Sequence, residues 1–171
     1  YEKWAKLHNL KQAARTLNFL TEHEIESYPD LESRVAEITA ASTEAAAALK
    51  AAERRLAEMA VLIKDVTTCK ELRPLLQEYQ RAADKKPFRR KHEGTLILYE
   101  AAAKALKEQG FQKLPDLYAL KNEYKQLAEQ KDQLQRRYAE AKRQMQEYDI
   151  IKQNVDGILR TTPGKEQMQE R

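Results

Sequence analysis

Two long heptad patterns constrain the fold of this chain more than any other feature. Between 31 and 66, and again between 117 and 148, apolar or small residues recur at alternating steps of four and three, the spacing of a coiled-coil seam. The first seam consists of Leu31, Val35, Ile38, Ser42, Ala45, Leu49, Ala52, Leu56, Met59, Ile63 and Val66. The second consists of Leu117, Leu120, Tyr124, Leu127, Lys131, Leu134, Tyr138, Ala141, Met145 and Tyr148. Lys131 is its only charged residue. Because each seam needs a partner, the sequence predicts that the two helices pair as a long antiparallel hairpin.

The composition favours an all-α fold. Helix-forming residues dominate. Only nine of the 171 residues, four Gly and five Pro, are of the two types that disfavour a helix interior. We expect a single elongated helical domain over 1–160, with long helices at about 30–66 and 115–159. A helical insert over about 68–110 lies at the far end of the hairpin, and 161–171 forms a frayed tail.

A first helix from about 2 to 23 is predicted to pack on the hairpin. Its apolar residues fall along one stripe, which we expect to be its buried face. The stripe consists of Trp4, Leu7, Leu10, Ala14, Leu17 and Leu20.

An offset of 86 residues relates two junctions between helices. Leu20, Glu22, Ile25, Pro29, Asp30 and Leu31 align with Leu106, Glu108, Phe111, Pro115, Asp116 and Leu117. Gly110 stands where a helix C-terminal cap prefers a left-handed residue, and Glu24 takes that place in the first copy. We therefore expect strain at Glu24, and we expect Ser27 to cap the following helix.

The insert between the long helices contains four positions at which a helix could start, bend or break. Thr68 and Glu71 have the spacing of a capping box, so a new helix is expected near them. Pro74 would then fall inside this helix, so the helix either kinks or restarts there, and a restart is the favoured prediction. Pro87 is expected to open the next helix, which bends or breaks at Gly94.

The hairpin has one favoured register. If Val66 lies near Leu117, then Lys131 lies beside Ala52, and a large side chain faces a small one.

No catalytic or metal-binding pattern is present. The three histidines, His8, His23 and His92, lack metal-ligand spacing, and Cys69 is the only cysteine. No glycine-rich loop offers a nucleotide cradle, and the tyrosines fall mainly on apolar stripes. We expect a fragment that is not an enzyme and that uses no cofactor and no metal.

The candidate binding site is a run of cations around one aromatic residue. It consists of Lys85, Lys86, Phe88, Arg89, Arg90 and Lys91. The cations could hold phosphates while Phe88 stacks on a base, or they could solvate an exposed turn while Phe88 anchors it in the core. A weaker group, expected to be a solvated helix face, consists of Arg136, Arg137, Lys142 and Arg143.

Charge and cysteine content limit the environment and the partners. The net charge of +4 and a pI near 9.0 permit a nucleic-acid partner without requiring one. No apolar run approaches the 18 or more residues of a membrane helix, and no signal peptide is seen. We expect a cytoplasmic protein without a membrane partner, and a fragment of a longer chain because no Met begins it.

Several segments resemble the C-terminal region of relaxases, the mobilisation nucleases of integrative and conjugative elements in Gram-positive gut bacteria. The similar stretches are Trp4–Ala14, Thr16–Leu17, Phe19–His23, Phe88, His92–Glu93, Lys113–Pro115 and Asn154–Asp156. The resemblance covers nearly the whole chain, and it departs at Glu24, where the family usually has Gly.

The resemblance implies a non-catalytic part of a DNA-processing protein. Relaxases of this kind nick one DNA strand with a tyrosine and a histidine-bound divalent metal, both in an N-terminal domain that is not matched here. The implied partners are DNA, other relaxosome or transfer proteins, or a second copy of the chain. The alternative is a coiled-coil interaction or spacer module without DNA binding.

Overall fold

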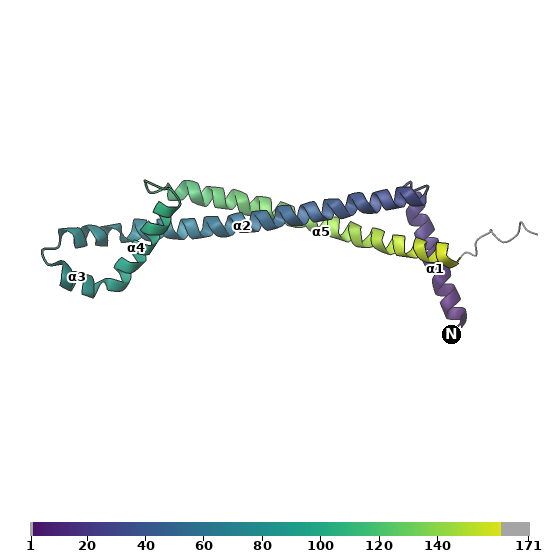
Figure 1. Ribbon diagram of the computed structural model, residues 1–171, viewed down its shortest axis with the longest axis horizontal. Coiled ribbons are helices and arrows are strands. Elements are labelled where there is room, and N and C mark those ends of the chain that lie inside the picture. The colour runs from purple at the N-terminus through teal and green to yellow at the C-terminus, as the bar shows by residue number, and fades with distance from the viewer. Residues whose placement is uncertain (1, 162–171) are drawn as a thin grey trace, which may run out of the picture. The chain divides into compact units, whose positions relative to one another are not determined.

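The computed structural model describes residues 2–161 and is all-α, as predicted. Within these residues there are five helices and no strand (Figure 1). They are α1 (Glu2–Glu22), α2 (Tyr28–Arg81), α3 (Lys85–Lys91), α4 (Glu93–Glu108) and α5 (Leu117–Thr161). The predicted tail lies outside the described residues, apart from Thr161, which ends α5.

The contacts divide the described residues into two units. The terminal unit contains 2–48 and 134–161, and the central unit contains 49–133. Both α2 and α5 contribute residues to each unit. That 1–160 behaves as a single domain stays a prediction.

In the terminal unit, α1 packs on α5, and the start of α2 lies beside the end of α5. The buried core consists of Phe19, Leu31, Tyr148 and Ile151. The Phe19 ring stacks on His23 at 3.9 Å between ring centroids and meets the Tyr148 ring edge-on at 4.9 Å. Such aromatic pairs add to the apolar burial that holds the three helices together.

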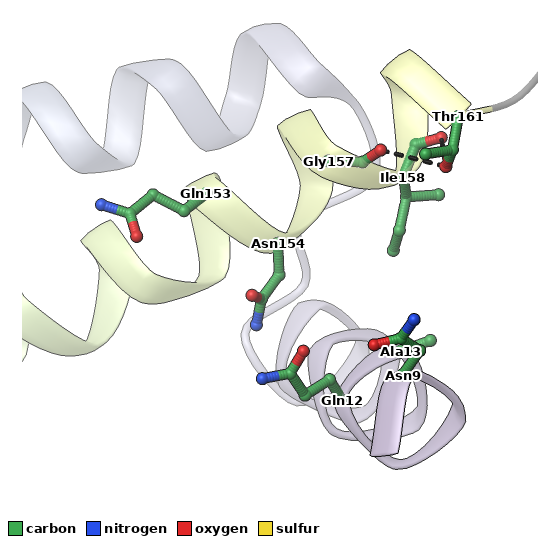
Figure 2. A pocket seen from close by; sticks show the side chains of 8 residues that line it. All are labelled: Asn9, Gln12, Ala13, Gln153, Asn154, Gly157, Ile158 and Thr161. Atoms are coloured by element: carbon green, nitrogen blue, oxygen red, sulfur yellow. Dashed lines mark hydrogen bonds between the residues drawn. The ribbon is translucent and has the colours of Figure 1, made fainter. Parts of the chain in front are cut away.

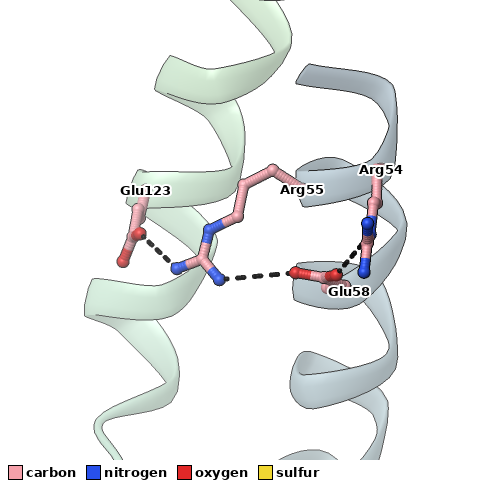
Figure 3. A network of polar contacts seen from close by, with 4 residues as sticks. All are labelled: Arg54, Arg55, Glu58 and Glu123. Atoms are coloured by element: carbon pink, nitrogen blue, oxygen red, sulfur yellow. Dashed lines mark hydrogen bonds and ion pairs between the residues drawn. The ribbon is translucent and has the colours of Figure 1, made fainter. Parts of the chain in front are cut away.

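In the central unit, α4 and the facing segments of α2 and α5 share one core. Its buried residues are Met59, Leu62, Val66, Cys69, Ala102 and Leu106. At its edge, Arg55 reaches across from α2 to Glu123 on α5 at 3.6 Å and also contacts Glu58 at 3.8 Å (Figure 3). These groups are half-exposed, so each pair contributes at most about 1 kcal/mol, and the apolar core dominates.

Burial confirms both predicted seams. Every position of the first seam is buried or half-buried, and so is every position of the second except Tyr124, which is 37% exposed. The antiparallel register is supported by a hydrogen bond in the terminal unit, which the Tyr28 hydroxyl donates to Asp156 at 2.6 Å. In the central unit, the pairing of Lys131 with Ala52 stays a prediction, and both residues are half-buried.

The restart at Pro74 was predicted wrongly, because α2 continues through Pro74 to Arg81. Proline removes one backbone hydrogen bond and crowds the preceding turn, which costs about 3 kcal/mol in a helix interior. Around Pro74, the side chains of Leu72, Leu75, Leu76 and Tyr79 are all half-buried. These side chains are partly withdrawn from solvent on both sides of the proline. Thr68 and Glu71 lie inside α2, so the predicted capping box is not at a helix start.

The buried face of α1 was also predicted wrongly. Trp4, Leu10 and Leu17 are 80%, 68% and 65% exposed, whereas Thr16 and Phe19 are buried. The face that contacts α5 carries the aromatic contacts of Phe19 and a hydrogen bond that the Asn154 amide donates to the Thr16 hydroxyl at 3.2 Å. These contacts fix the orientation of α1: its stripe from Trp4 to Leu17 points away from α5, and only Leu20, the last residue of the predicted stripe, is half-buried against the core.

The two junctions end their first helix in the same way. Glu24 has φ 54° and Gly110 has φ 88°, both in the left-handed region. The backbone N–H of Ile25 donates to Leu20 at 2.9 Å, and that of Phe111 donates to Leu106 at 3.0 Å. This six-to-one bond defines a Schellman motif, so the repeat is real at this point.

The following helices start differently. The Ser27 hydroxyl accepts from the Asp30 N–H at 3.3 Å, and α2 begins at Tyr28, so the predicted Ser27 cap is confirmed. At the second junction the equivalent residue is Lys113, which cannot accept a hydrogen bond through its side chain. The Asp116 carboxylate accepts from the Tyr118 N–H at 3.0 Å instead, and α5 begins at Leu117.

Candidate functional site

The predicted basic segment forms α3, a helix of seven residues in the central unit. Its start is fixed by Asp84, whose carboxylate accepts from the Lys86 backbone N–H at 3.2 Å. It ends at Lys91, and His92 separates α3 from α4, two residues before the predicted bend at Gly94. Seven residues are too few for a stable isolated helix, so α3 depends on contacts with its neighbours.

Phe88 anchors one face of α3. Its side chain is half-buried, and its ring centroid lies 6.0 Å from that of Tyr79 on α2 and 4.6 Å from that of His92. The ring therefore joins α3 to the end of α2. This contact supports an anchoring role for Phe88, and which of the two predicted roles it plays stays a prediction.

Arg89 joins α3 to α4. Its Nη1 and Nη2 donate to the two carboxylate oxygens of Glu100 at 2.9 and 3.1 Å, a bidentate pair. The hydrogen bond to Glu100, with a smaller contribution from Tyr79, raises the pKa of Arg89, and the Arg89 hydrogen bond lowers the pKa of Glu100. The guanidinium is therefore engaged within the chain, and Arg89 holds the segment in place.

The other four cations of the segment, Lys85, Lys86, Arg90 and Lys91, are exposed. Lys86 and Arg90 are four residues apart and share a helix face, while Phe88, two residues from each, lies on the opposite face. Cations at this spacing repel each other and destabilise a helix by about 0.2 to 0.5 kcal/mol per pair. The sequence predicted the cations but missed the Arg89–Glu100 pair.

The second basic group is partly engaged within α5. Arg143 donates to Glu140 at 2.7 Å, and the Lys142 ammonium lies 6.0 Å from the centroid of the Tyr138 ring. Arg136 and Arg137 are exposed. These contacts fit the predicted solvated helix face.

A polar groove of about 300 Å³ lies between α1 and α5 in the terminal unit (Figure 2). Its walls include the carboxamides of Asn9 and Gln12 on α1 and of Gln153 and Asn154 on α5. Asn154 points toward α1 and is held by its bond to Thr16. None of the lining side chains is ionisable, so the groove offers hydrogen bonds but no acid or base.

A polar triad ties α2 to α5 in the terminal unit. The Asp156 carboxylate accepts from the Tyr28 hydroxyl at 2.6 Å and pairs with the Lys152 ammonium at 3.3 Å. These hydrogen bonds, that of Tyr28 first, lower the pKa of Asp156. The hydrogen bond with Asp156 raises the pKa of the Tyr28 hydroxyl. Hydrogen bonds with Tyr28 and Asp156 raise the pKa of the Lys152 ammonium. The ammonium also lies 5.7 Å from the centroid of the Tyr28 ring. The sequence pattern did not indicate this triad.

Other reactive side chains are dispersed. Among residues 2–161, no group of three or more His, Cys, Asp or Glu side chains could hold a metal ion. Cys69 is buried, and that burial raises the pKa of its thiol. A raised thiol pKa reduces the fraction of reactive thiolate at neutral pH.

Comparison with known proteins gives no relative: no family model, no curated protein and no solved structure matches this chain. None of the helices in the described part of the chain is long and apolar enough to cross a membrane.

Proposed function

We propose that this chain is a non-catalytic, cytoplasmic helical domain of a DNA-processing protein of the relaxase class that it resembles, and that α3 contacts the phosphate backbone. One observation carries the proposal. Lys85, Lys86, Arg90 and Lys91 are all exposed on a short helix that Phe88 and Arg89 hold against its neighbours, and Lys86 and Arg90 share the face opposite Phe88.

The energetics of α3 support an anionic partner. The exposed cations repel each other. Among the described residues, the Glu100 carboxylate pairs with Arg89, and the Asp84 carboxylate accepts from the Lys86 backbone N–H, so neither is bonded to one of the four exposed side-chain cations. Phosphate groups would relieve this repulsion and release counterions, which drives binding without reading sequence. The contact is therefore assigned to the four exposed cations, while Phe88 and Arg89 position α3.

Fluorescence anisotropy with labelled DNA duplexes of several sequences tests the proposal. Binding should be salt-dependent, with log affinity falling by about 0.9 per contacted phosphate for each tenfold rise in salt. The double variant Arg90→Glu/Lys91→Glu should bind every sequence more weakly, and its salt slope should be shallower by about 2.

Arg136→Glu/Arg137→Glu is the matched control, because it also reverses two adjacent exposed cations on a helix. This control should retain most of the affinity. Equal losses in the two variants would mean that net charge alone drives binding, and unchanged affinity in the α3 variant would exclude α3 as the contact.

An interaction or spacer module is the second candidate function, and the burial of both seams favours it. An α-helix is a suitable spacer because its length follows directly from its residue count. Sedimentation at several concentrations, together with the DNA titration, separates the candidates: a chain that dimerises and binds no DNA supports the second.

A further inference from the structure

The outward face of α1 carries a third heptad seam. Leu7, Leu10, Ala14 and Leu17 follow one another at steps of three, four and three, the spacing of alternating a and d positions. All four are exposed, and so is every residue from 3 to 12. Figure 1 shows the N-terminal end of α1 projecting away from α5.

This seam lies opposite the face that α1 uses within the chain. Leu7 and Thr16 are nine residues apart, as are Leu10 and Phe19, and nine residues make two and a half helical turns. Thr16 and Phe19 are buried against α5, so the seam points outward. Within the described residues, nothing covers it.

The charges beside the seam are all positive. Residues 3–21 contain four cations, at Lys3, Lys6, Lys11 and Arg15, and no Asp or Glu. With Leu7 at position a, Lys6 takes the flanking position g and Lys11 the flanking position e. These two positions select the partner in a coiled coil, because they face the partner's own flanking charges.

The same charges disfavour a second copy as the occupant. A parallel pair of α1 helices would place Lys6 of one copy against Lys11 of the other. An antiparallel pair would place each lysine against its own equivalent. Both arrangements set cation against cation, whereas a helix with Glu or Asp at its flanking positions would form ion pairs.

We propose that the outward seam of α1 docks an acidic amphipathic helix of a partner protein. The leucines supply the apolar contact, and Lys6 and Lys11 select a partner with carboxylates beside its own apolar seam. This inference rests on α1 alone and does not depend on DNA binding by α3.

A synthetic peptide serves as the probe. It has three heptads, Ile at a, Leu at d, Glu at e and g, and no aromatic residue; a second peptide has Lys at e and g. Trp4, the only tryptophan of the chain and 80% exposed, lies beside the seam and reports binding by a blue shift of its emission. The full chain should bind the Glu peptide at least about tenfold more tightly than the Lys peptide.

Two variants separate the apolar contribution from the charge contribution. Leu10→Gln/Leu17→Gln should weaken binding of the Glu peptide by about tenfold or more, and both sites are exposed, so the fold should be unaffected. Ile97→Gln/Leu98→Gln on α4 is the matched control, 51% and 62% exposed, and should bind normally. Lys6→Glu/Lys11→Glu should reverse the preference toward the Lys peptide.

Three results would overturn the proposal. The first is that the chain binds the two peptides equally tightly, or that it binds neither of them. The second is a dimer of the full chain in sedimentation that Leu10→Gln/Leu17→Gln abolishes, since the occupant would then be a second copy. The third is a Trp4 blue shift with phosphatidylserine vesicles but not with the Glu peptide.

Discussion

Glu24 holds a backbone conformation that suits glycine. Its φ of 54° lies in the left-handed region, and the Schellman hydrogen bonds around it match those around Gly110. For a residue with a Cβ atom, this conformation costs roughly 1 to 2 kcal/mol. Glu24 therefore lowers the stability of a junction that Gly would form without strain.

Replacement of this residue tests the strain directly. Glu24→Gly should raise the free energy of unfolding by about 1 kcal/mol, and thermal melting should show a rise of about 3 °C. Glu26→Gly is the matched control, because it removes the same side chain nearby where no left-handed backbone is present. A melting temperature that stays level or falls for Glu24→Gly would contradict this account of the turn.

The triad of Tyr28, Lys152 and Asp156 should make stability depend on pH at both extremes. The pKa of Asp156 is lowered by folding, so its contribution is present above the unfolded pKa near 3.9 and is lost as pH falls through the folded value. The pKa of Tyr28 is raised, so its contribution is present below about 10 and is lost as pH rises through the folded value.

Tyr28→Phe isolates this effect, because it removes only the hydroxyl that donates to Asp156. The difference in melting temperature between the wild type and Tyr28→Phe should be largest between about pH 5 and 9 and should shrink toward both extremes. A difference that is constant from pH 3 to 11 would mean that the hydroxyl does not act through this hydrogen bond.

At the scale of elements, Pro74 is the main irregularity. It is exposed and lies inside α2, seven residues before Arg81 ends the helix. Pro74→Ala should therefore stabilise the chain by about 1 to 3 kcal/mol in chemical denaturation, because Ala restores the backbone N–H and removes the steric conflict.

Pro87 provides the control for this substitution, since it lies in the first turn of α3, where proline is tolerated. Pro87→Ala should change stability little. Destabilisation by Pro74→Ala would show that the helix depends on a bend at this residue.

The two seams could be predicted from the sequence because a heptad pattern that repeats over many turns identifies the buried face of a helix. Ser27 and Gly110 were readable because few side chains suit a helix cap or a left-handed turn. The buried face of α1 could not be predicted from the sequence. Both its leucine stripe and the face around Phe19 are apolar enough to be buried, and only tertiary contacts decide which of the two packs against α5. The Arg89–Glu100 pair was hidden for another reason: eleven residues span about 16 Å of straight helix, and the two meet only because the chain turns at His92.

At the scale of the whole molecule, both proposed surfaces depend on helix pairing within one chain. The exposure of the α3 cations depends on the contacts of Phe88 with α2 and of Arg89 with α4, two helices that share the core of the central unit. The orientation of the α1 seam follows from the packing of Phe19 in the terminal unit. If the seams paired between chains instead, both surfaces would have to be reassigned.

Cross-linking tests this pairing most directly. In a Cys69→Ser background, the double variant Ala52→Cys/Lys131→Cys places two thiols at half-buried seam positions of α2 and α5 in the central unit. A short thiol-to-thiol cross-linker, applied at several protein concentrations, should give a cross-linked monomer whose yield does not depend on concentration. A covalent dimer, or a yield that rises with concentration, would contradict the intrachain hairpin.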